Sequence, residues 1–440
     1  MKPLISNHYS KRNPSSIREA QIIFSSRDDC ESVRVINLAI GNISLPMHPE
    51  MIQKMKDLGH KVFEDGVVKY EPTIGNIKTR QAFLNILSSL EINTDLVQCL
   101  VTDGGSAAME LMLLGVCGPS SKNPIMMLDP TYTNYVDFSK RLAIPTISYQ
   151  RKLNKNGNFN PLDYDLIEQM IIKEKPLGLI IIPYDNPSGQ LIEHDSLIKI
   201  VKICVKHNLW IISDEAYRSL YYEREKKASS IWSLSDKEVK GIIGRRISIE
   251  SSSKVWNACG LRIGALLTDN KTFHNKATFE YTANLSANTL GQEIFGVLAE
   301  QKKDELLMWY KKQNKYYRNI MKKLKMNLQK EIPDLIVSTP EAAIYFILDF
   351  KNIVDKNFDS VSFTNYSASK GKILIKGKFY TLLLAPMKSF YNNPNFGQFQ
   401  MRLAAVEPPE KIKLCPKILK QLLLNFCKKN NIDISLDDIQ

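Results

Sequence analysis

Four short polar segments carry side chains that could take part in chemistry. They are Gly-Gly-Ser at 104–106, Asp-Asn-Pro-Ser-Gly at 185–189, Asp-Glu-Ala-Tyr at 214–217 and Ser-Ser-Ser-Lys at 251–254. Singly, each has an ordinary structural explanation as a helix start or a polar turn. The same groups could do chemistry, because backbone N–H groups at a helix start bind phosphate, and carboxylate and amine side chains move protons.

Short apolar runs that alternate with helical patterns must position these segments. Strands are expected at 124–129, 177–183, 209–213 and 261–268, and helices at 106–117, 162–173 and 196–207. Buried strands separated by helices indicate the α/β class, with a mostly parallel sheet and helices on both faces. The polar segments then fall at strand ends, where open sheets of this class bind their ligands.

The last part of the chain has a different pattern. A long helical zone at about 289–330 precedes expected strands at 344–350, 373–375, 379–384 and 400–404 and a terminal helix near 416–429. This grouping predicts a smaller α+β domain. We expect an arm and part of the small domain at 1–48, the large domain at 49–300 and the small domain at 301–440. The rest of 351–395 has no clear pattern.

The net charge of +13, from 59 basic and 46 acidic residues, invites a nucleic-acid partner. The excess is diffuse, however, and its densest run, 302–330, has an apolar stripe at helical spacing, which is typical of an amphipathic helix with a solvated basic face. A regulatory module that binds duplex DNA is a weaker alternative, because the 35 residues before Ile36 are too few for a winged-helix domain. We therefore expect no nucleic-acid partner.

Cysteine and histidine spacing also excludes some classes. The seven cysteines never approach C-x-x-C spacing, which favours free thiols in a reducing compartment. No H-E-x-x-H motif is present, so no metal site is expected. No apolar run approaches the ~18 residues of a membrane span, and the first 18 residues lack the apolar stretch of a secretory signal. We expect a cytoplasmic protein, with an organelle transit peptide as the alternative.

The order and spacing of the polar residues carry more information than any single segment. The set is Gly104, Gly105, Ser106, Tyr132, Asn186, Asp214, Tyr217, Lys254, Arg262 and Arg402. It resembles the class I/II aminotransferases, which are fold-type-I enzymes that depend on pyridoxal 5′-phosphate. The resemblance covers nearly the whole chain, from 37–41 to Arg402. It implies an aspartate-aminotransferase-like fold, with a large cofactor-binding domain and a smaller α+β domain.

The resemblance assigns the catalytic roles to Lys254, Asp214 and Tyr217. Lys254 would bind the cofactor aldehyde as a Schiff base and then move the proton at the substrate Cα. Asp214 would pair with the protonated ring nitrogen, which lets the ring accept electrons. Asn186 and Tyr217 would donate hydrogen bonds to the ring's phenolate oxygen, and Tyr132 would stack on the ring face.

The same resemblance implies where the phosphate and the substrate bind. The phosphate would be held by the helix start at 104–106 and by further side chains. Those further residues are Ser251, Ser253, Arg262 and, from the neighbouring subunit of a homodimer, Tyr70. Arg402 would bind the substrate α-carboxylate in a bidentate fork. Gly41 would line the same pocket, together with Asn186, where a side chain would block the substrate.

We therefore predict transamination between an L-amino acid and a 2-keto acid. A lyase, decarboxylase or cyclising synthase of the same fold is the alternative, because the cofactor stabilises a carbanion in all of them. The sequence departs from the family around Tyr345, where the preceding 340–344 lack a common glycine, and at 255–259 beside the lysine. No Lys or Arg occurs from 277 to 301, so this segment shows no residue that could bind the second carboxylate of a dicarboxylic substrate.

Overall fold

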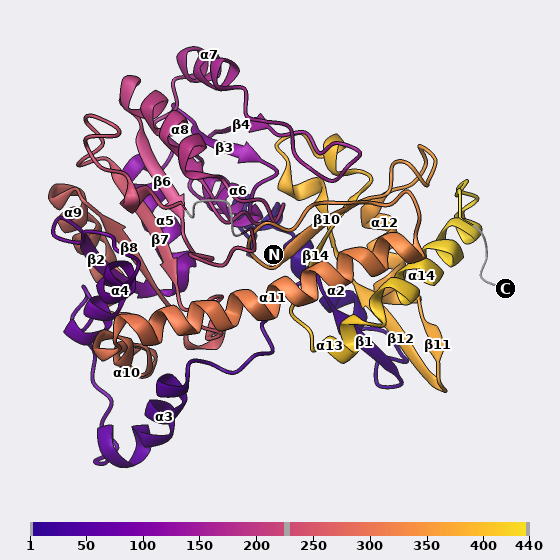
Figure 1. Cartoon of the computed structure of the whole chain (residues 1–440), viewed down its shortest axis with the longest axis horizontal. Coiled ribbons are helices and arrows are strands. Elements are labelled where there is room, and N and C mark those ends of the chain that lie inside the picture. The colour runs from indigo at the N-terminus through magenta and orange to yellow at the C-terminus, as the bar shows by residue number, and fades with distance from the viewer. Residues whose placement is uncertain (1–2, 224–228, 437–440) are drawn as a thin grey trace.

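The computed structural model describes residues 3–223 and 229–436 (Figure 1). Its largest sheet has the strand order β2-β8-β7-β6-β5-β3-β4. The strands are β2 (Gln98–Asp103), β3 (Ile125–Asp129), β4 (Thr146–Gln150), β5 (Gly178–Ile181), β6 (Trp210–Asp214), β7 (Arg246–Ser251) and β8 (Ile263–Thr268). Only β8 runs antiparallel to its neighbours, so the predicted mostly parallel sheet is confirmed. We call this sheet with its helices the larger half.

Helices cover both faces of this sheet. They include α5 (Gly104–Val116), α6 (Thr133–Arg141), α7 (Tyr164–Glu174), α8 (His194–Lys206) and α9 (Lys271–Tyr281). Successive residues of β5 enter different cores: Leu179 and Ile181 share one with Leu197 of α8, whereas Ile180 shares the other with Met112 of α5. Both faces are buried, and this explains why the strands read as continuous apolar runs rather than alternating ones.

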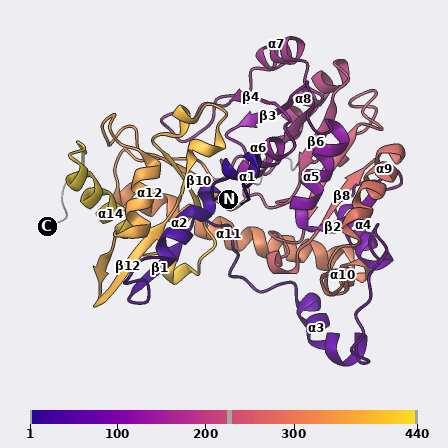
Figure 2. The same cartoon turned by 180° about the vertical axis from the view of Figure 1, so that it is seen from behind.

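Two small sheets form the smaller half. One has the order β13-β14-β10-β9 and the other β1-β12-β11. Their strands are β1 (Val33–Asn37), β9 (Ile336–Val337), β10 (Tyr345–Asp349), β11 (Ile373–Ile375), β12 (Lys378–Leu383), β13 (Ala385–Pro386) and β14 (Gln400–Ala404). The helices α2 (Ser16–Ser25), α12 (Ser360–Ser369) and α14 (Cys415–Asn430) pack on them. Figure 2 shows α2 beside β1 and β12.

A single long helix, α11 (Lys303–Glu331), runs from the larger half to the smaller half (Figure 1). The apolar stripe expected in this segment is buried, which confirms an amphipathic helix. The sequence suggested one helical zone, but the structure separates α10 (Thr289–Gly296) and a 3-10 turn, η5 (Val297–Glu300), from α11. The domain boundaries at 48/49 and 300/301 stay a prediction.

Most of the remaining helices are short. They are α1 (Asn7–Ser10), α3 (Pro49–Asp57), the π turn η1 (Leu58–Val62), α4 (Ile77–Ser89), α13 (Pro409–Ile412) and the 3-10 turns η2 (Ile231–Ser233), η3 (Cys259–Leu261), η4 (Thr282–Asn284), η6 (Met387–Phe390) and η7 (Pro394–Gly397). Within the described residues, no helix combines the length and apolar character of a membrane span. The cytoplasmic location stays a prediction.

Candidate active site

A cavity of about 920 Å³ lies where the carboxyl ends of the strands meet the smaller half. Twelve of the residues predicted from the sequence line it: Gly41, Gly105, Ser106, Tyr132, Asn186, Asp214, Tyr217, Ser251, Ser253, Lys254, Arg262 and Arg402. Its size suits a cofactor together with a small substrate. Of the predicted residues, Gly104 and Tyr70 are not in its wall. Tyr70 is 79% exposed and lies in a separate hollow with Asn288 and Thr289.

The amine of Lys254 reaches across to the smaller half. Its Nζ donates a hydrogen bond of 2.5 Å to the carbonyl oxygen of Gly41. The loop that carries it is fixed by Ser252, whose backbone N–H and hydroxyl both donate to the carbonyl oxygen of Ile263, at 3.0 and 2.9 Å. A Cβ atom at Gly41 would lie 2.9 Å from this Nζ and 2.5 Å from the hydroxyl of Tyr345. Position 41 therefore has no room for a side chain.

Asp214 ends β6 as a buried carboxyl group facing the cavity. It accepts hydrogen bonds from the Tyr135 hydroxyl (2.9 Å) and the Ala216 backbone N–H (3.1 Å). It forms no ion pair with any residue in the described ranges. Burial raises the pKa of Asp214 to about 6, against these two hydrogen bonds. A buried carboxyl group without a cation suits a ligand that brings a positive charge.

The first turn of α5 provides an anion site next to a guanidinium. Gly105 and Ser106 lie at the helix N-terminus, where free N–H groups and the helix dipole attract phosphate. Gly104 has φ +73°, and a Cβ there would lie 2.5 Å from the nearest guanidinium nitrogen of Arg262. Gly104 therefore serves the cavity by making room for Arg262 rather than by lining it.

Arg402 of β14 is almost completely buried, and its guanidinium faces the cavity. It donates to the Asn186 side-chain oxygen (2.8 Å) and to the Ala39 carbonyl oxygen (2.7 Å). The guanidinium lies over the ring of Tyr345, 4.4 Å from its centroid. Its Nε has no hydrogen-bond partner among the described residues. An unpartnered, buried donor on a fixed guanidinium fits a carboxylate ligand.

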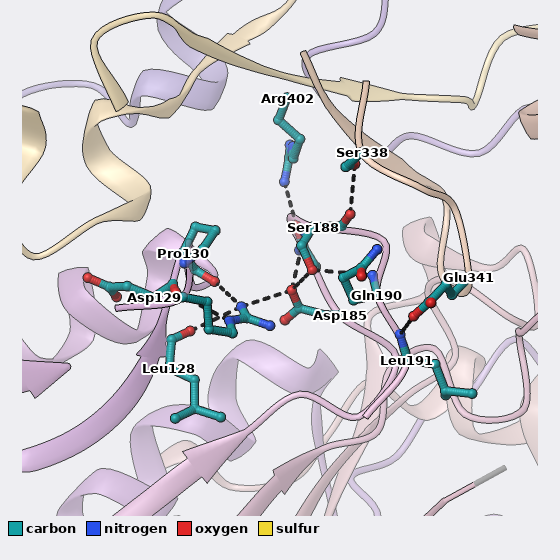
Figure 3. A network of polar contacts seen from close by, with 12 residues as sticks. Leu128, Asp129, Pro130, Asp185, Ser188, Gln190, Leu191, Ser338, Glu341 and Arg402 are labelled. Atoms are coloured by element: carbon teal, nitrogen blue, oxygen red, sulfur yellow. Dashed lines mark hydrogen bonds and ion pairs between the residues drawn. The ribbon is translucent and has the colours of Figure 1, made fainter. Parts of the chain in front are cut away.

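The loop that presents Asn186 is held from both halves (Figure 3). Arg151 pairs with Asp185 at 3.0 Å and donates to the Leu128 and Pro130 carbonyl oxygens, which fixes one side. On the other side, the Ser338 hydroxyl donates to the Ser188 carbonyl oxygen at 2.9 Å. Nine-tenths or more of each of Asp185, Asn186 and Ser188 is buried. The predicted polar turn is thus a rigid part of the cavity wall.

Sequence reasoning missed several residues of the cavity. Tyr345 lines it, and its hydroxyl is 2.7 Å from that of Tyr217, so the Tyr217 hydroxyl contacts protein here. Tyr135 supports Asp214 from one helical turn beyond Tyr132, a spacing that could have suggested it. Ile17, Arg18 and Gln21 of α2 also line the cavity, and no motif pointed to that helix.

These features fit pyridoxal 5′-phosphate, which has an anionic phosphate, a ring nitrogen that can be protonated and an aldehyde that reacts with amines. The anion site at α5 with Arg262, the unpaired Asp214 carboxyl group and the Lys254 amine match these three parts. In the described residues, no cluster of His, Cys, Asp or Glu could hold a metal ion.

Comparison with known proteins gives the class of the chain. Residues 33–402 match the family model described as aminotransferase class I and II, so the chain belongs to that family. It is a pyridoxal-phosphate-dependent aminotransferase, as the sequence predicted.

The particular relatives are distant. The chain is 23% identical over 360 residues to an aspartate aminotransferase of Sulfolobus acidocaldarius, covering 80% of this chain and 84% of that protein. It is also 23% identical over 380 residues to aromatic-amino-acid aminotransferase 2 of Thermococcus litoralis, covering 84% and 89%. In fold it is similar to a putative kynurenine aminotransferase from Saccharomyces cerevisiae, with a TM-score of 0.77, 19% identity and coverage of 96% and 99%.

The contacts around Gly41 make its substitution a test of the cavity. Gly41→Ala places a Cβ against Lys254 Nζ and the Tyr345 hydroxyl, so we expect kcat/KM to fall by about 100-fold, because catalytic groups displaced by about 1 Å lose that much. Steady-state kinetics measures the loss, and thermal unfolding checks the fold. Gly59→Ala is the control, since a Cβ there meets nothing within 4 Å. Equal activity of the two variants would contradict the close contact.

The raised pKa of Asp214 predicts a pH-dependent cost to stability. In the cofactor-free chain, the folded carboxyl holds its proton up to a pKa of about 6, compared with about 3.9 when unfolded. The free energy of unfolding therefore falls as the pH rises through this window. Asp214→Asn cannot ionise, and we expect it to stabilise the cofactor-free chain by roughly 2–3 kcal/mol at pH 8 and much less near pH 4.

Urea unfolding of the cofactor-free chain at the two pH values measures this difference. Asp95→Asn removes an exposed carboxyl group and is the matched control. A gain of the same size at both pH values, or none at pH 8, would contradict a carboxyl group that is costly to ionise.

Proposed function

We propose that this chain exchanges an amino group between an L-amino acid and a 2-keto acid with Lys254, Asp214 and Arg402 as its central groups. The observation that carries the proposal is that one cavity contains an amine, a buried carboxyl group without a cation and a buried guanidinium with an unpartnered N–H. When bound, pyridoxal 5′-phosphate supplies an electron-withdrawing ring that stabilises negative charge at the substrate Cα.

Lys254 has two tasks in this proposal. Its amine would hold the cofactor covalently between turnovers, and once released, the Nζ would act as the base that accepts and returns the proton of the substrate Cα. The carbonyl oxygen of Gly41, 2.5 Å from Nζ, orients the amine toward the cavity. Because Nζ must act as a base, it must be neutral when the substrate is bound.

Asp214 would hold the ring nitrogen of the cofactor and keep it protonated, so the desolvated carboxyl group would gain a charged partner. Tyr135 and Ala216 fix the carboxyl group, so it does not need to reorganise during turnover. Tyr132 would pack against the ring, and the Tyr217 hydroxyl, which here lies 2.7 Å from that of Tyr345, would donate to the phenolate oxygen.

The phosphate would bind at the N-terminus of α5. Gly105 and Ser106 offer backbone N–H groups, and the Ser251 and Ser253 hydroxyls and Arg262 complete the set. Arg402 binds the substrate α-carboxylate, with Asn186 fixing the plane of the guanidinium at 2.8 Å. Gly41 leaves space for the bound substrate.

Removal of the amine tests the proposal directly. Lys254→Ala should lower steady turnover by at least about 1,000-fold, because it removes both the anchoring group and the base. It should also lose covalently held cofactor during gel filtration. The assay is a panel of amino donors with keto-acid acceptors, and Lys240→Ala, an exposed lysine, is the control. Keto acid released over many turnovers without any acceptor would contradict transamination and indicate elimination.

We propose in addition that two copies share their active sites through Tyr70. This exposed tyrosine lies outside its own cavity wall, so it is available to a neighbouring chain. Tyr70→Phe should weaken retention of the cofactor by about 10-fold, the value of one hydrogen bond to a charged phosphate. Cofactor dissociation during dialysis measures this change.

Complementation shows whether the tyrosine acts between subunits. Lys254→Ala and Tyr70→Phe chains, coexpressed with different tags and purified as the mixed dimer, should form one intact and one doubly defective site per dimer. Tight cofactor binding at half of the sites supports sharing. No tight site in the mixed dimer would contradict it, and a monomer in sedimentation would also do so.

A further inference from the structure

Arg18 stands at the cavity in a position that the catalytic roles do not use. It lies in the first turn of α2, and with Ile17 and Gln21 it forms the part of the cavity wall that this helix contributes. Arg18 is exposed, whereas Ile17 is buried and anchors the helix in a core with Ala385 and Met387. The helix is thus fixed to the smaller half with the guanidinium at the solvent side of the cavity.

The charges of the cavity wall do not balance. The guanidinium groups of Arg18, Arg262 and Arg402 face two acidic residues, Asp214 and Glu407. Glu407 is already engaged, because it accepts from the Asn37 backbone N–H at 3.2 Å and pairs with Lys411 at 2.9 Å. The cavity wall therefore carries more positive than negative charge, and this excess favours the binding of anionic ligands.

The proposed function assigns anions to two of the three guanidinium groups. Arg262 lies at the phosphate site against Gly104, and Arg402 meets the α-carboxylate. Arg18 is left over, and among the described residues its guanidinium has no ion-pair or hydrogen-bond partner. Its charge nevertheless acts inside the cavity: burial raises the pKa of Tyr132 to about 12, and Arg18 is one of the nearby cations that oppose the rise.

Arg18 and Arg402 belong to one framework. The core around Ile17 joins α2 to β13, and β13 pairs with β14 at Ala385 and Arg402. The backbone positions of the two arginines are therefore held in a fixed relation by the smaller half alone. Two guanidinium groups that extend from one framework to the same cavity suit a ligand that carries two carboxylates.

We propose that Arg18 binds an acidic group on the substrate side chain, so that this aminotransferase accepts dicarboxylic amino acids and keto acids. The inference rests on the proposed function, in which Arg402 binds the α-carboxylate. Arg18 would thus recognise the second carboxylate of such a substrate, a role for which residues 277 to 301 provide no Lys or Arg. An exposed arginine elsewhere on a helix would be merely solvated, but this one faces the cavity that receives the substrate.

The test compares acidic and neutral substrates in matched variants. Arg18→Gln removes the charge and leaves a shorter polar side chain, Arg18→Lys keeps the charge without the fork, and Arg12→Gln removes an equal charge outside the cavity wall. We expect Arg18→Gln to lower kcat/KM for L-aspartate and L-glutamate by about 10- to 100-fold, the effect of one charge-assisted contact. The values for L-leucine and L-methionine, with pyruvate as acceptor, should stay within about 2-fold. For the acidic substrates, the kcat/KM of Arg18→Lys should lie between those of Arg18→Gln and the unmodified enzyme.

Equilibrium binding gives a readout that does not depend on turnover. Succinate should bind the cofactor-loaded enzyme about 10- to 100-fold more weakly after Arg18→Gln, whereas propionate should be unaffected, as calorimetry can measure. Thermal unfolding of each variant shows whether the fold is intact. Raised ionic strength should weaken succinate binding in the unmodified enzyme more than in Arg18→Gln, because this cation is exposed.

The outcomes separate this inference from the proposed function. Equal losses for acidic and neutral substrates, or no loss for either, would overturn the role of Arg18. Turnover of neutral donors by the unmodified enzyme, with none of acidic donors, would overturn it while leaving transamination intact. Lack of turnover with every donor would instead refute the proposed function itself.

Discussion

The burial of the Asp214 carboxyl group is the constraint on which the rest of the site depends. The group ends a strand with an apolar core on each side, and no cation reaches it from the described residues. Behind it, Arg218 pairs with both Glu215 and Glu250, a buried cluster with one excess negative charge. Glu250 adds to the rise in the Asp214 pKa. An ionised Asp214 is thus unfavourable without a ligand, and in the proposed function a cationic ring nitrogen would offset this cost.

The sequence predicts those parts of the site that local chemistry determines. Asp214, Lys254 and the loop at 185–189 adjoin apolar strands, and the parallel order of those strands brings their ends to one edge. Tyr345 and Arg18 were missed, because only the packing of the smaller half against the larger brings them to the cavity. A lone arginine on an exposed helix face gives no signal that separates it from the other 58 basic residues.

For the fold as well, the sequence predicts the elements that local composition determines and misses those that depend on tertiary packing. Four of the seven strands of the large sheet, β3, β5, β6 and β8, were located within a few residues, since a buried strand reads clearly in composition. The strands β2, β4 and β7 were not expected. Helix α12 was not expected, because Ser, Thr and Asn make up much of its sequence and these residues favour caps and turns over helix interiors. Asp359 caps its start by accepting from Ser362, and Phe363 fixes it in the core. Tertiary burial therefore outweighs weak propensity there.

The division of the site between the two halves has a consequence for substrate binding. Lys254 and Asp214 belong to the larger half, whereas Gly41 and Arg402 belong to the smaller half. In the chain without ligands, the Lys254–Gly41 and Asn186–Arg402 hydrogen bonds connect the halves. In the proposed function, a cofactor bound to Lys254 would replace the contact of its amine with Gly41, whereas Asn186 would continue to hold the Arg402 guanidinium beside the substrate α-carboxylate. Ligand contacts would thus take the place of one protein contact between the halves, and the ligands would help to set the relation between the halves that catalysis needs.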